Sequence, residues 1–276
     1  MKLSVSTAIF KASFLNAFEE DSYENMFKKV IQSGYDGIEF MPYNPNEVNL
    51  KSISNFIKND FEICAIATGP ISFYHKVSYL DPNEENRMKS IKLTKDYIDL
   101  AYKLESPIVI IGTARGKIIE NVSLENAFEW FIECMEKIDE YAEKRNIKIV
   151  IEPINRYETN FINKLEEAIK IIDQYSLRST YVMADTFHMN IEEPIIEESL
   201  RNSKGKILHI HIADSNRWPP GYGHINFKSI IETLKNINYK GFLSIECLPK
   251  PDINTALNNS IKYLKSILLK NMNFDE

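Results

Sequence analysis

The sequence alternates eight times between a short run rich in β-branched residues and a longer segment with helical periodicity. The expected strands are Leu3–Ser6, Gly37–Phe40, Ile63–Thr68, Ile108–Gly112, Lys148–Glu152, Tyr181–Asp185, Ile207–Ala213 and Phe242–Cys247. The expected helices include Tyr23–Ser33, Glu84–Leu104, Leu124–Lys144, Leu165–Tyr175, Phe227–Asn236 and Asn254–Lys270. Alternation of this kind favours parallel strands joined by right-handed crossovers. Eight such units in 276 residues predict an α/β fold, a (β/α)₈ TIM barrel.

An open, doubly wound sheet is the alternative architecture for this pattern. The first expected strand is not followed by a Gly-x-Gly-x-x-Gly turn, which weakens the case for a dinucleotide-binding version of that fold. No stretch rich in proline, glycine or serine marks a domain boundary. We therefore expect a single domain over residues 1–276, with a frayed tail after Lys270.

The composition argues against several classes of function. The formal net charge is −6, whereas a surface that binds nucleic acid is normally basic. No apolar run approaches the roughly 18–20 residues that span a bilayer. Cys64, Cys134 and Cys247 form no Cys-x-x-Cys pair and are expected to be buried thiols in a reducing compartment. With no signal peptide recognised at the N-terminus, we expect a cytoplasmic protein that binds neither nucleic acid nor membrane.

Acidic and imidazole side chains recur at the ends of four successive expected strands. Glu152, Asp185 and Glu246 end the fifth, sixth and eighth strands, and His211 lies near the end of the seventh. In a TIM barrel the active site forms at the carboxyl ends of the strands. Each residue alone is more often a structural polar group, but four at matching depth in adjacent strands favour a functional site.

Three carboxylates and one imidazole are a typical donor set for a hard or borderline divalent cation. Ligand softness favours Mn²⁺ first, with Mg²⁺ and Co²⁺ as alternatives, whereas a closed structural zinc site would normally use thiolates. Without a cation, carboxylates held this close would raise one another's pKa values. The cluster is therefore predicted to bind a divalent metal.

A divalent cation beside carboxylates suits proton abstraction next to a carbonyl, because the enediolate that forms is stabilised as its charge develops. Glu152 and Glu246 come from strands three positions apart, so they are expected to flank the substrate. One would remove a proton and the other would return a proton to the opposite face of the same carbon.

Four segments carry a resemblance to a known family: IEPINRYETNFIN (151–163), ADTFHMNIEE (184–193), HIADSNRWPPGYGHINF (211–227) and SIECLP (244–249). They resemble the ketose 3-epimerases of the xylose-isomerase-like barrel superfamily, a group that includes D-tagatose and D-psicose 3-epimerases. The resemblance is nearest to 5-keto-L-gluconate epimerases. The N-terminal half agrees more loosely, through CAIATG (64–69) and IVIIGTARGK (108–117).

The resemblance implies roles for individual residues. Glu152 and Glu246 match glutamates that are both metal ligands and the acid/base pair, and Asp185 and His211 match the other two ligands. The residues implied to contact substrate oxygens are Glu158, His188 and Arg217. The family uses Mn²⁺ or a similar ion and no redox cofactor.

The sequence departs from the enzymes that act on neutral ketoses. The first barrel loop, TAIFKASF (7–14), has no tryptophan, and Leu248 stands where a phenylalanine is expected. Arg115 and Lys117 are available to receive a carboxylate or phosphate, although a solvated loop charge explains them equally well. These departures favour a keto-sugar acid, with 5-keto-L-gluconate as the best candidate.

Other functions remain open at this point. One is epimerisation of neutral ketoses, and another is aldose–ketose isomerisation or dehydration on the same barrel. An endonuclease IV-like nuclease is disfavoured by five histidines and the acidic charge, and a binding module would not need the paired glutamates. Glu39 fits a contact that supports a metal ligand and a purely structural role equally well, and His209 is expected to be buried one layer below His211. The expected partners are a small keto-sugar and further copies of the chain, as a dimer or tetramer.

Overall fold

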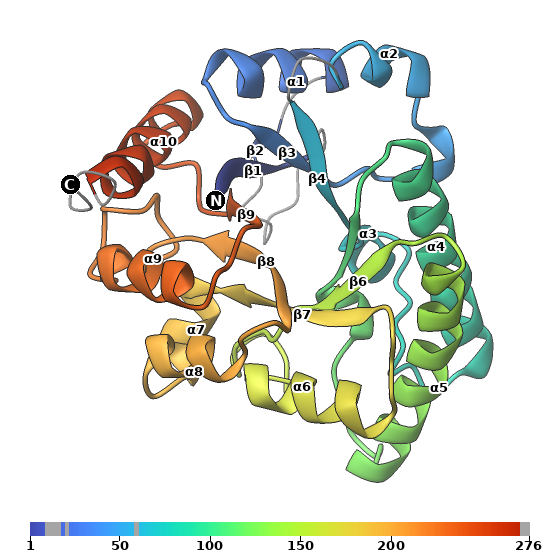
Figure 1. Ribbon diagram of the computed structural model, residues 1–276. Helices are drawn as coiled ribbons and strands as arrows, with labels where there is room; N and C mark the ends of the chain where they lie inside the picture. Colours follow the sequence, from blue (N-terminus) through green and yellow to red (C-terminus); the bar gives the residue numbers. More distant parts are fainter. Residues whose placement is uncertain (9–17, 20–21, 58–60, 271–276) are drawn as a thin grey trace.

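The computed structural model describes residues 1–8, 18–19, 22–57 and 61–270. Its strands are β1 (Lys2–Ala8), β2 (Phe18–Glu19), β3 (Gly37–Phe40), β4 (Glu62–Ala67), β5 (Ile108–Ile111), β6 (Lys148–Ile151), β7 (Thr180–Asp185), β8 (Ile207–Ile212) and β9 (Phe242–Ile245). The sheet order is β2-β1-β3-β4-β5-β6-β7-β8-β9, and β1 also pairs with β9. That pairing closes eight parallel strands into a barrel, and the two-residue strand β2 pairs in parallel with the end of β1, at Thr7 and Ala8 (Figure 1).

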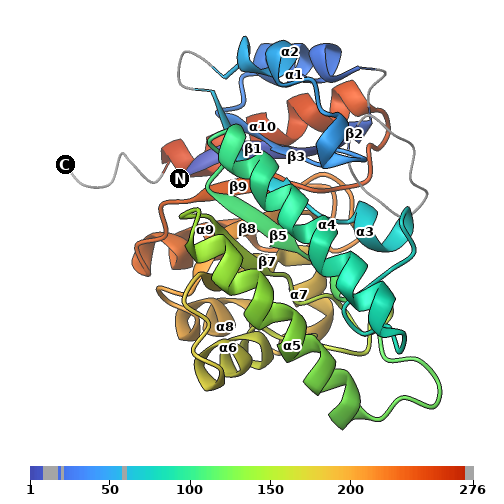
Figure 2. The same cartoon turned by 90° about the vertical axis from the view of Figure 1, so that its right-hand side faces the viewer.

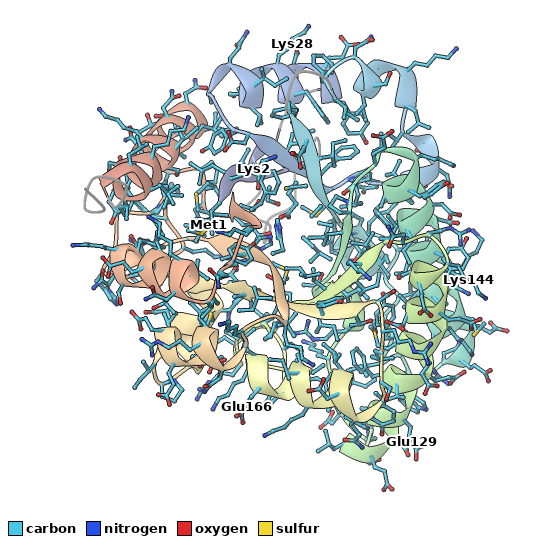
Figure 3. The ribbon with its side chains drawn as sticks, viewed as in Figure 1. Met1, Lys2, Lys28, Glu129, Lys144 and Glu166 are labelled. Atoms are coloured by element: carbon cyan, nitrogen blue, oxygen red, sulfur yellow. The ribbon has the colours of Figure 1, made fainter. Side chains whose placement is uncertain are left out.

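The helices form a ring around the barrel (Figures 1 and 2). They are α1 (Tyr23–Gln32), α2 (Leu50–Ser54), α3 (Pro70–Phe73), α4 (Glu84–Lys103), α5 (Leu124–Glu143), α6 (Leu165–Gln174), α7 (Thr186–Glu192), α8 (Ile196–Asn202), α9 (Phe227–Asn236) and α10 (Ile253–Lys270). Two short 3₁₀ helices lie at Pro45–Glu47 and Thr113–Arg115. Charged side chains such as Lys28, Glu129, Lys144 and Glu166 are exposed on the outer helices (Figure 3).

Apolar side chains pack in two layers. The larger layer lies between the outer faces of the strands and the helices, and Val5, Phe27, Ile149 and Leu234 belong to it. A smaller cluster includes the strand residues Cys64, Ala65, Ile110, Val150 and Met183. Side chains alternate between the two faces of a strand, so residues of one strand supply both layers.

The strand register places the expected site residues side by side. Asp185 of β7 pairs with His211 of β8, and His211 in turn pairs with Ser244 of β9. Glu152 directly follows β6, and Glu246 directly follows β9. Because the strands are parallel, these residues meet at the carboxyl end of the barrel.

The structure confirms the TIM barrel, and each of the eight expected strands and six expected helices is present. The sequence did not predict helix α7, which directly follows β7, or helix α8, which comes after α7. The predicted fraying of the tail after Lys270 concerns residues outside those described. The three cysteines are buried and unpaired, as expected. Within the described part of the chain, no helix combines the length and the hydropathy needed to cross a bilayer.

Candidate functional site

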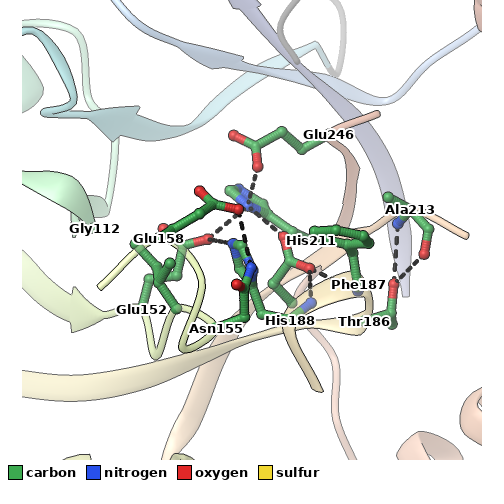
Figure 4. A network of polar contacts seen from close by, with 12 residues as sticks. Gly112, Glu152, Asn155, Glu158, Thr186, Phe187, His188, His211, Ala213 and Glu246 are labelled. Atoms are coloured by element: carbon green, nitrogen blue, oxygen red, sulfur yellow. Dashed lines mark hydrogen bonds and ion pairs between the residues drawn. The ribbon is translucent and has the colours of Figure 1, made fainter. Parts of the chain in front are cut away.

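Four residues from consecutive strands converge at the carboxyl end of the barrel: Glu152, Asp185, His211 and Glu246. Their ligand atoms all lie within 4.8 Å of one another. His211 Nδ1 lies 3.3 Å from Glu152 Oε1, 3.6 Å from Asp185 Oδ2 and 3.3 Å from Glu246 Oε2. Figure 4 shows the carboxylates of Glu152 and Glu246 reaching this imidazole from different sides.

The chemistry of this cluster fits a divalent cation. Asp185 Oδ2 and His211 Nδ1 are buried and have no hydrogen-bond partner. Unpartnered buried polar atoms are costly, and here they face the same small space as two further carboxylates. The donor set of three oxygen ligands and one nitrogen ligand is one that Mn²⁺, Mg²⁺ or Co²⁺ accepts. The sequence-predicted metal ligands are thus brought together in a geometry that suits the ion.

The charges of the cluster depend strongly on one another. Burial alone would raise the pKa of Asp185, but His188 and His211 hold it well below the usual range of an aspartate. Burial disfavours the imidazolium of His211, yet the neighbouring carboxylates of Glu39 and Glu246 raise its pKa well above the ordinary value. The imidazole therefore compensates part of the negative charge that the carboxylates concentrate here.

Glu39 lies at the other side of the same imidazole. Its Oε2 accepts hydrogen bonds from His209 Nε2 and from His211 Nε2, each at 2.8 Å. Burial would raise the pKa of Glu39, but the charge of His211 and these hydrogen bonds lower it well below the usual range. His209 is buried as expected, and both residues belong to the support of His211.

The residues implied to contact substrate border the metal cluster. Arg217 Nη1 donates to Glu158 Oε1 at 2.9 Å, and Arg217 Nη2 lies 3.6 Å from Glu246 Oε2. Arg217 also stacks on the ring of Phe187, with its guanidinium carbon 4.9 Å from the ring centroid. His188 Nε2 lies 3.9 Å from Glu152 Oε1. Glu158, His188 and Arg217 therefore lie beside the cluster, whereas the fourth predicted substrate-binding residue, Arg115, is placed differently.

Sequence reasoning missed Asn155, which links two of these residues. Its Nδ2 donates to Glu158 Oε1 at 2.9 Å and lies 2.7 Å from His188 Nδ1, while its Oδ1 accepts from the Tyr157 amide. Because the amide nitrogen donates, His188 Nδ1 must accept, and the neutral ring carries its proton on Nε2, on the side of Glu152. The motif IEPIN offered one signal, since an asparagine four residues past the end of β6 is well placed to cap a loop.

The loop that carries Arg217 is organised by Asp214, which is buried. Asp214 Oδ1 accepts from the amides of Ser215 and Ile225, and Oδ2 accepts from the amide of Gly221. The backbone of Arg217 adopts a positive φ of 61°, a conformation that is uncommon for a residue with a side chain. The loop is therefore held in one shape by hydrogen bonds within residues 214–225.

The structure corrects the prediction for Arg115. Its side chain is completely buried, and its guanidinium donates to the carbonyls of Gly112, Glu152, Phe161 and Ile162 at 2.6–3.0 Å. Burial lowers its pKa to about 10. Four of the five N–H groups are thus engaged by the backbone, which leaves no fork for a substrate carboxylate. Arg115 fastens the ends of β5 and β6, whereas Lys117 is exposed.

Two adjoining cavities lie at this end of the barrel. One of about 50 Å³ is lined by Glu152, His211 and Glu246, together with other residues. A second cavity of about 200 Å³ is lined by Ser72, Gly116, Lys117 and Thr159, together with other residues. The two share the lining residues Gly112, Thr113, Ile154 and Glu158. A ligand at the metal cluster therefore has room to extend past Glu158 toward Lys117.

Comparison with known proteins agrees with this architecture. A family model described as a xylose isomerase-like TIM barrel matches residues 27–267. An L-ribulose 3-epimerase of Methylomonas sp. is 28% identical over 232 residues, which is 83% of this chain and 80% of that protein. A D-psicose 3-epimerase of Ruminiclostridium cellulolyticum is 27% identical over 272 residues, which is 94% of this chain and 88% of that protein.

Comparison with solved structures agrees with the barrel fold. A solved structure of an L-ribulose 3-epimerase superposes with a TM-score of 0.84 at 20% identity, over 98% of this chain and 95% of that chain. At this level of identity the superposition shows the shared fold. The family model covers most of the sequence, including β3 to β9 and the four clustered residues. The chain is therefore a member of the xylose isomerase-like TIM barrel family.

Proposed function

We propose that this protein is a metal-dependent epimerase that inverts the carbon next to the carbonyl of a ketose or keto-sugar acid, at C3. The observation that carries the proposal is the meeting of Glu152 and Glu246 at one imidazole nitrogen, each 3.3 Å from His211 Nδ1. Two carboxylates that approach one small space from different strands can serve opposite faces of a planar intermediate. The relatives named as ketose 3-epimerases support this reading.

The reaction needs a proton acceptor on one face and a proton donor on the other. In our proposal the Glu152 carboxylate removes the C3 proton, and the electron pair of the broken C–H bond delocalises into the carbonyl to form an enediolate. Glu246, protonated at the start, returns a proton to the opposite face of C3. After one turnover Glu152 carries the proton and Glu246 is ionised, which is the starting state of the reverse reaction. Exchange of one proton at each carboxyl group with solvent restores the starting state of the forward reaction.

Four residues would hold the cation beside this carbon: Glu152, Asp185, His211 and Glu246. A bound divalent cation, Mn²⁺ in our proposal, supplies Lewis-acid polarisation of the carbonyl oxygen. Arg217 and Glu158 orient the hydroxyl groups nearest the reacting carbon. His188, with its proton on Nε2, offers a further donor on the side of Glu152.

We propose that the far end of the substrate occupies the larger cavity, beside Lys117. The cavity of about 200 Å³ adjoins the metal cluster at Glu158, and Lys117 is an exposed cation in its lining. This arrangement supports a keto-sugar acid such as 5-keto-L-gluconate. With Arg115 occupied by backbone carbonyls, the case for an anionic substrate rests on Lys117, and neutral ketoses remain the second candidate.

Deuterium exchange tests the proposal. The Mn²⁺-loaded protein is incubated in D₂O with 5-keto-L-gluconate, D-tagatose, D-fructose, D-psicose or L-ribulose, and NMR identifies the carbon that gains deuterium. We expect exchange at the carbon next to the carbonyl, which is C3 of the neutral ketoses and C4 of 5-keto-L-gluconate, and a loss of about 10²–10⁴ in rate for Glu152→Gln or Glu246→Gln. Exchange with the keto acid alone supports the role of Lys117, and exchange with neutral sugars alone rejects it.

The same experiment separates the alternatives. Deuterium that appears on the neighbouring carbon of an aldose product would identify an isomerase, and loss of a hydroxyl group would identify a dehydratase. No exchange in any sugar, with metal bound, would contradict the epimerase proposal. The nuclease alternative is not favoured by the net charge of −6 or by the epimerase relatives. We further propose a cytoplasmic location. We also propose a dimer or tetramer, and light scattering after size-exclusion chromatography tests this oligomeric state.

A further inference from the structure

Glu39 is a completely buried carboxylate on β3 that no step of the proposed proton transfer uses. Three donors converge on it. Ser6 Oγ donates to Oε1 at 2.8 Å, and His209 Nε2 and His211 Nε2 both lie 2.8 Å from Oε2. The three partners come from β1 and β8, so the carboxylate ties three strands together inside the barrel.

The hydrogen bonds determine which nitrogen of each imidazole carries the proton. A carboxylate that receives three donors acts as an acceptor only, so both imidazoles donate to it from Nε2. A cation that binds at His211 replaces the second proton of the imidazolium, and in the neutral ring that remains Nδ1 is unprotonated and offers a lone pair. His211 Nδ1 is buried without a hydrogen-bond partner and faces Glu152, Asp185 and Glu246.

We propose that Glu39 is a positioning residue that fixes the tautomer and the ring orientation of His211, so that Nδ1 is presented to the divalent cation. A carboxylate behind a ligating imidazole also makes the imidazole a stronger ligand. His209 and Ser6 complete the arrangement by holding the two oxygens of Glu39 in place. This inference rests on the proposed metal site, and it is independent of which sugar reacts.

Two substitutions separate the charge of Glu39 from its shape. In Glu39→Gln the amide oxygen can still accept from both imidazoles while the amide nitrogen donates to Ser6 Oγ, so the tautomer is kept and the charge is lost. Glu39→Leu removes both. We expect Mn²⁺ affinity to fall about 10–100-fold in Glu39→Leu and by a smaller factor in Glu39→Gln. The affinity is measured without substrate, by electron paramagnetic resonance of free Mn²⁺.

Asp139 provides a matched control. It is another buried carboxylate that accepts three hydrogen bonds, from the amides of Arg178 and Ser179 and the hydroxyl of Thr180. These partners lie just before and at the start of β7, at the end of the barrel opposite the metal cluster. Asp139→Asn should lower thermal stability and leave Mn²⁺ affinity unchanged. A purely structural Glu39 would behave in the same way.

The tautomer is read directly by ¹⁵N NMR of histidine in the Zn²⁺-loaded protein. We expect His211 to show a protonated Nε2 and a metal-bound Nδ1, and His209 to show a protonated Nε2. A metal-bound Nε2 on His211, or a Mn²⁺ affinity in both Glu39 variants within twofold of the wild type, would overturn the inference. Should Glu39→Leu fail to fold, Glu39→Gln and the NMR spectrum of the unsubstituted protein decide it. Failure of the epimerase proposal appears separately, as absent deuterium exchange in a protein with the expected tautomer.

Discussion

Arg217 Nη1 lies 2.9 Å from Glu158 Oε1, and this ion pair joins the loop after β8 to the loop after β6. The same guanidinium extends to Glu246, with Nη2 3.6 Å from Oε2. The side chain of Arg217 is largely buried, and nearby Glu246, Asp185 and Glu158 raise its pKa although burial opposes its charge. One planar side chain thus connects a proposed substrate contact with a proposed proton donor.

Replacing this fork by a single ammonium group should weaken substrate binding. A lysine keeps the charge of Arg217 but cannot hold two carboxylates in a fixed plane. A hydrogen bond to a charged group contributes about 1.5–3 kcal/mol, so Arg217→Lys should raise KM about tenfold or more and lower kcat as well. Steady-state kinetics with the best sugar of the exchange panel measure both. Arg178→Lys, at an exposed pair with Glu143, is the control and should change neither.

Gly112 is a second position where the backbone determines the site. A Cβ added to Gly112 would overlap Glu152 Oε2. Because displacement of a reacting group by about 1 Å can cost 10²-fold in rate, Gly112→Ala should lower kcat by about that factor and weaken Mn²⁺ binding. Circular dichroism of the metal-free protein should show an intact barrel.

Gly205 is the contrasting position. It has a positive φ of 78°, and a Cβ there would meet no heavy atom within 4 Å. Gly205→Ala should therefore cost about 1–2 kcal/mol of stability through backbone strain and leave Mn²⁺ binding unchanged. Equal loss of Mn²⁺ affinity in the two alanine variants would contradict the specific displacement of Glu152.

Arg115 should stabilise the fold without selecting the substrate. Arg115→Met removes donors from carbonyls of Gly112, Glu152, Phe161 and Ile162, and each buried carbonyl left without a donor costs about 1–3 kcal/mol. Urea denaturation should show a large fall in the midpoint. The ratio of kcat/KM for keto acid to neutral ketose should stay constant in this variant.

Lys117→Met is the complementary variant, since the side chain of Lys117 is exposed. It should leave the denaturation midpoint unchanged. If the substrate is anionic, it should lower the ratio of kcat/KM for keto acid to neutral ketose about tenfold, the equivalent of about 1.4 kcal/mol. A changed ratio in Arg115→Met and an unchanged ratio in Lys117→Met would show that Arg115, and not Lys117, selects the anionic substrate.

The sequence predicted the barrel because strands and longer helices have different periods of hydrophobic residues. Each period can be recognised within a short stretch of the sequence. Helix α7 escaped prediction because seven residues are too few to show a period. It is initiated instead by Asp185, whose Oδ1 accepts from the amides of Phe187 and His188. The residue expected to hold metal is therefore also the cap of the next helix.

The candidate site likewise contains residues that the sequence predicted and contacts that it could not predict. Glu152, Asp185, His211 and Glu246 were found because parallel strands bring their carboxyl ends to one level. The contact of Glu39 with His211 spans 172 positions in the sequence, and no local pattern encodes it. The orientation of Arg115 likewise depends on carbonyls up to 47 residues away, which attract the guanidinium that the sequence alone left free for a substrate.

Glu192 of α7 should make the free energy of unfolding depend on pH, because its carboxylate binds Arg156 on the loop that also carries Glu158. Its Oε1 accepts from the Arg156 amide and Nε at 2.6 and 2.9 Å, and its Oε2 accepts from Nη2 at 2.8 Å. Burial would raise the pKa of Glu192, but these bonds lower it below its ordinary value of 4.5. A carboxylate whose pKa is lowered by folding adds stability above the unfolded pKa, and that stability is lost as the pH falls through the folded pKa.

Glu192→Gln should therefore lower Tm at pH 6, and the difference from the wild type should shrink as the pH falls toward 3 and the wild-type carboxylate takes up its proton. Thermal melts of the metal-free proteins between these two pH values measure the difference, and the other carboxylates titrate alike in both. Loss of the Arg156–Glu192 contact should also make the loop between β6 and α6 less ordered. Because this loop carries Glu158, the proposed substrate contact, KM should rise, with less effect on kcat. Parallel Tm curves for the two proteins across this range would show that the Arg156–Glu192 contact does not stabilise the loop.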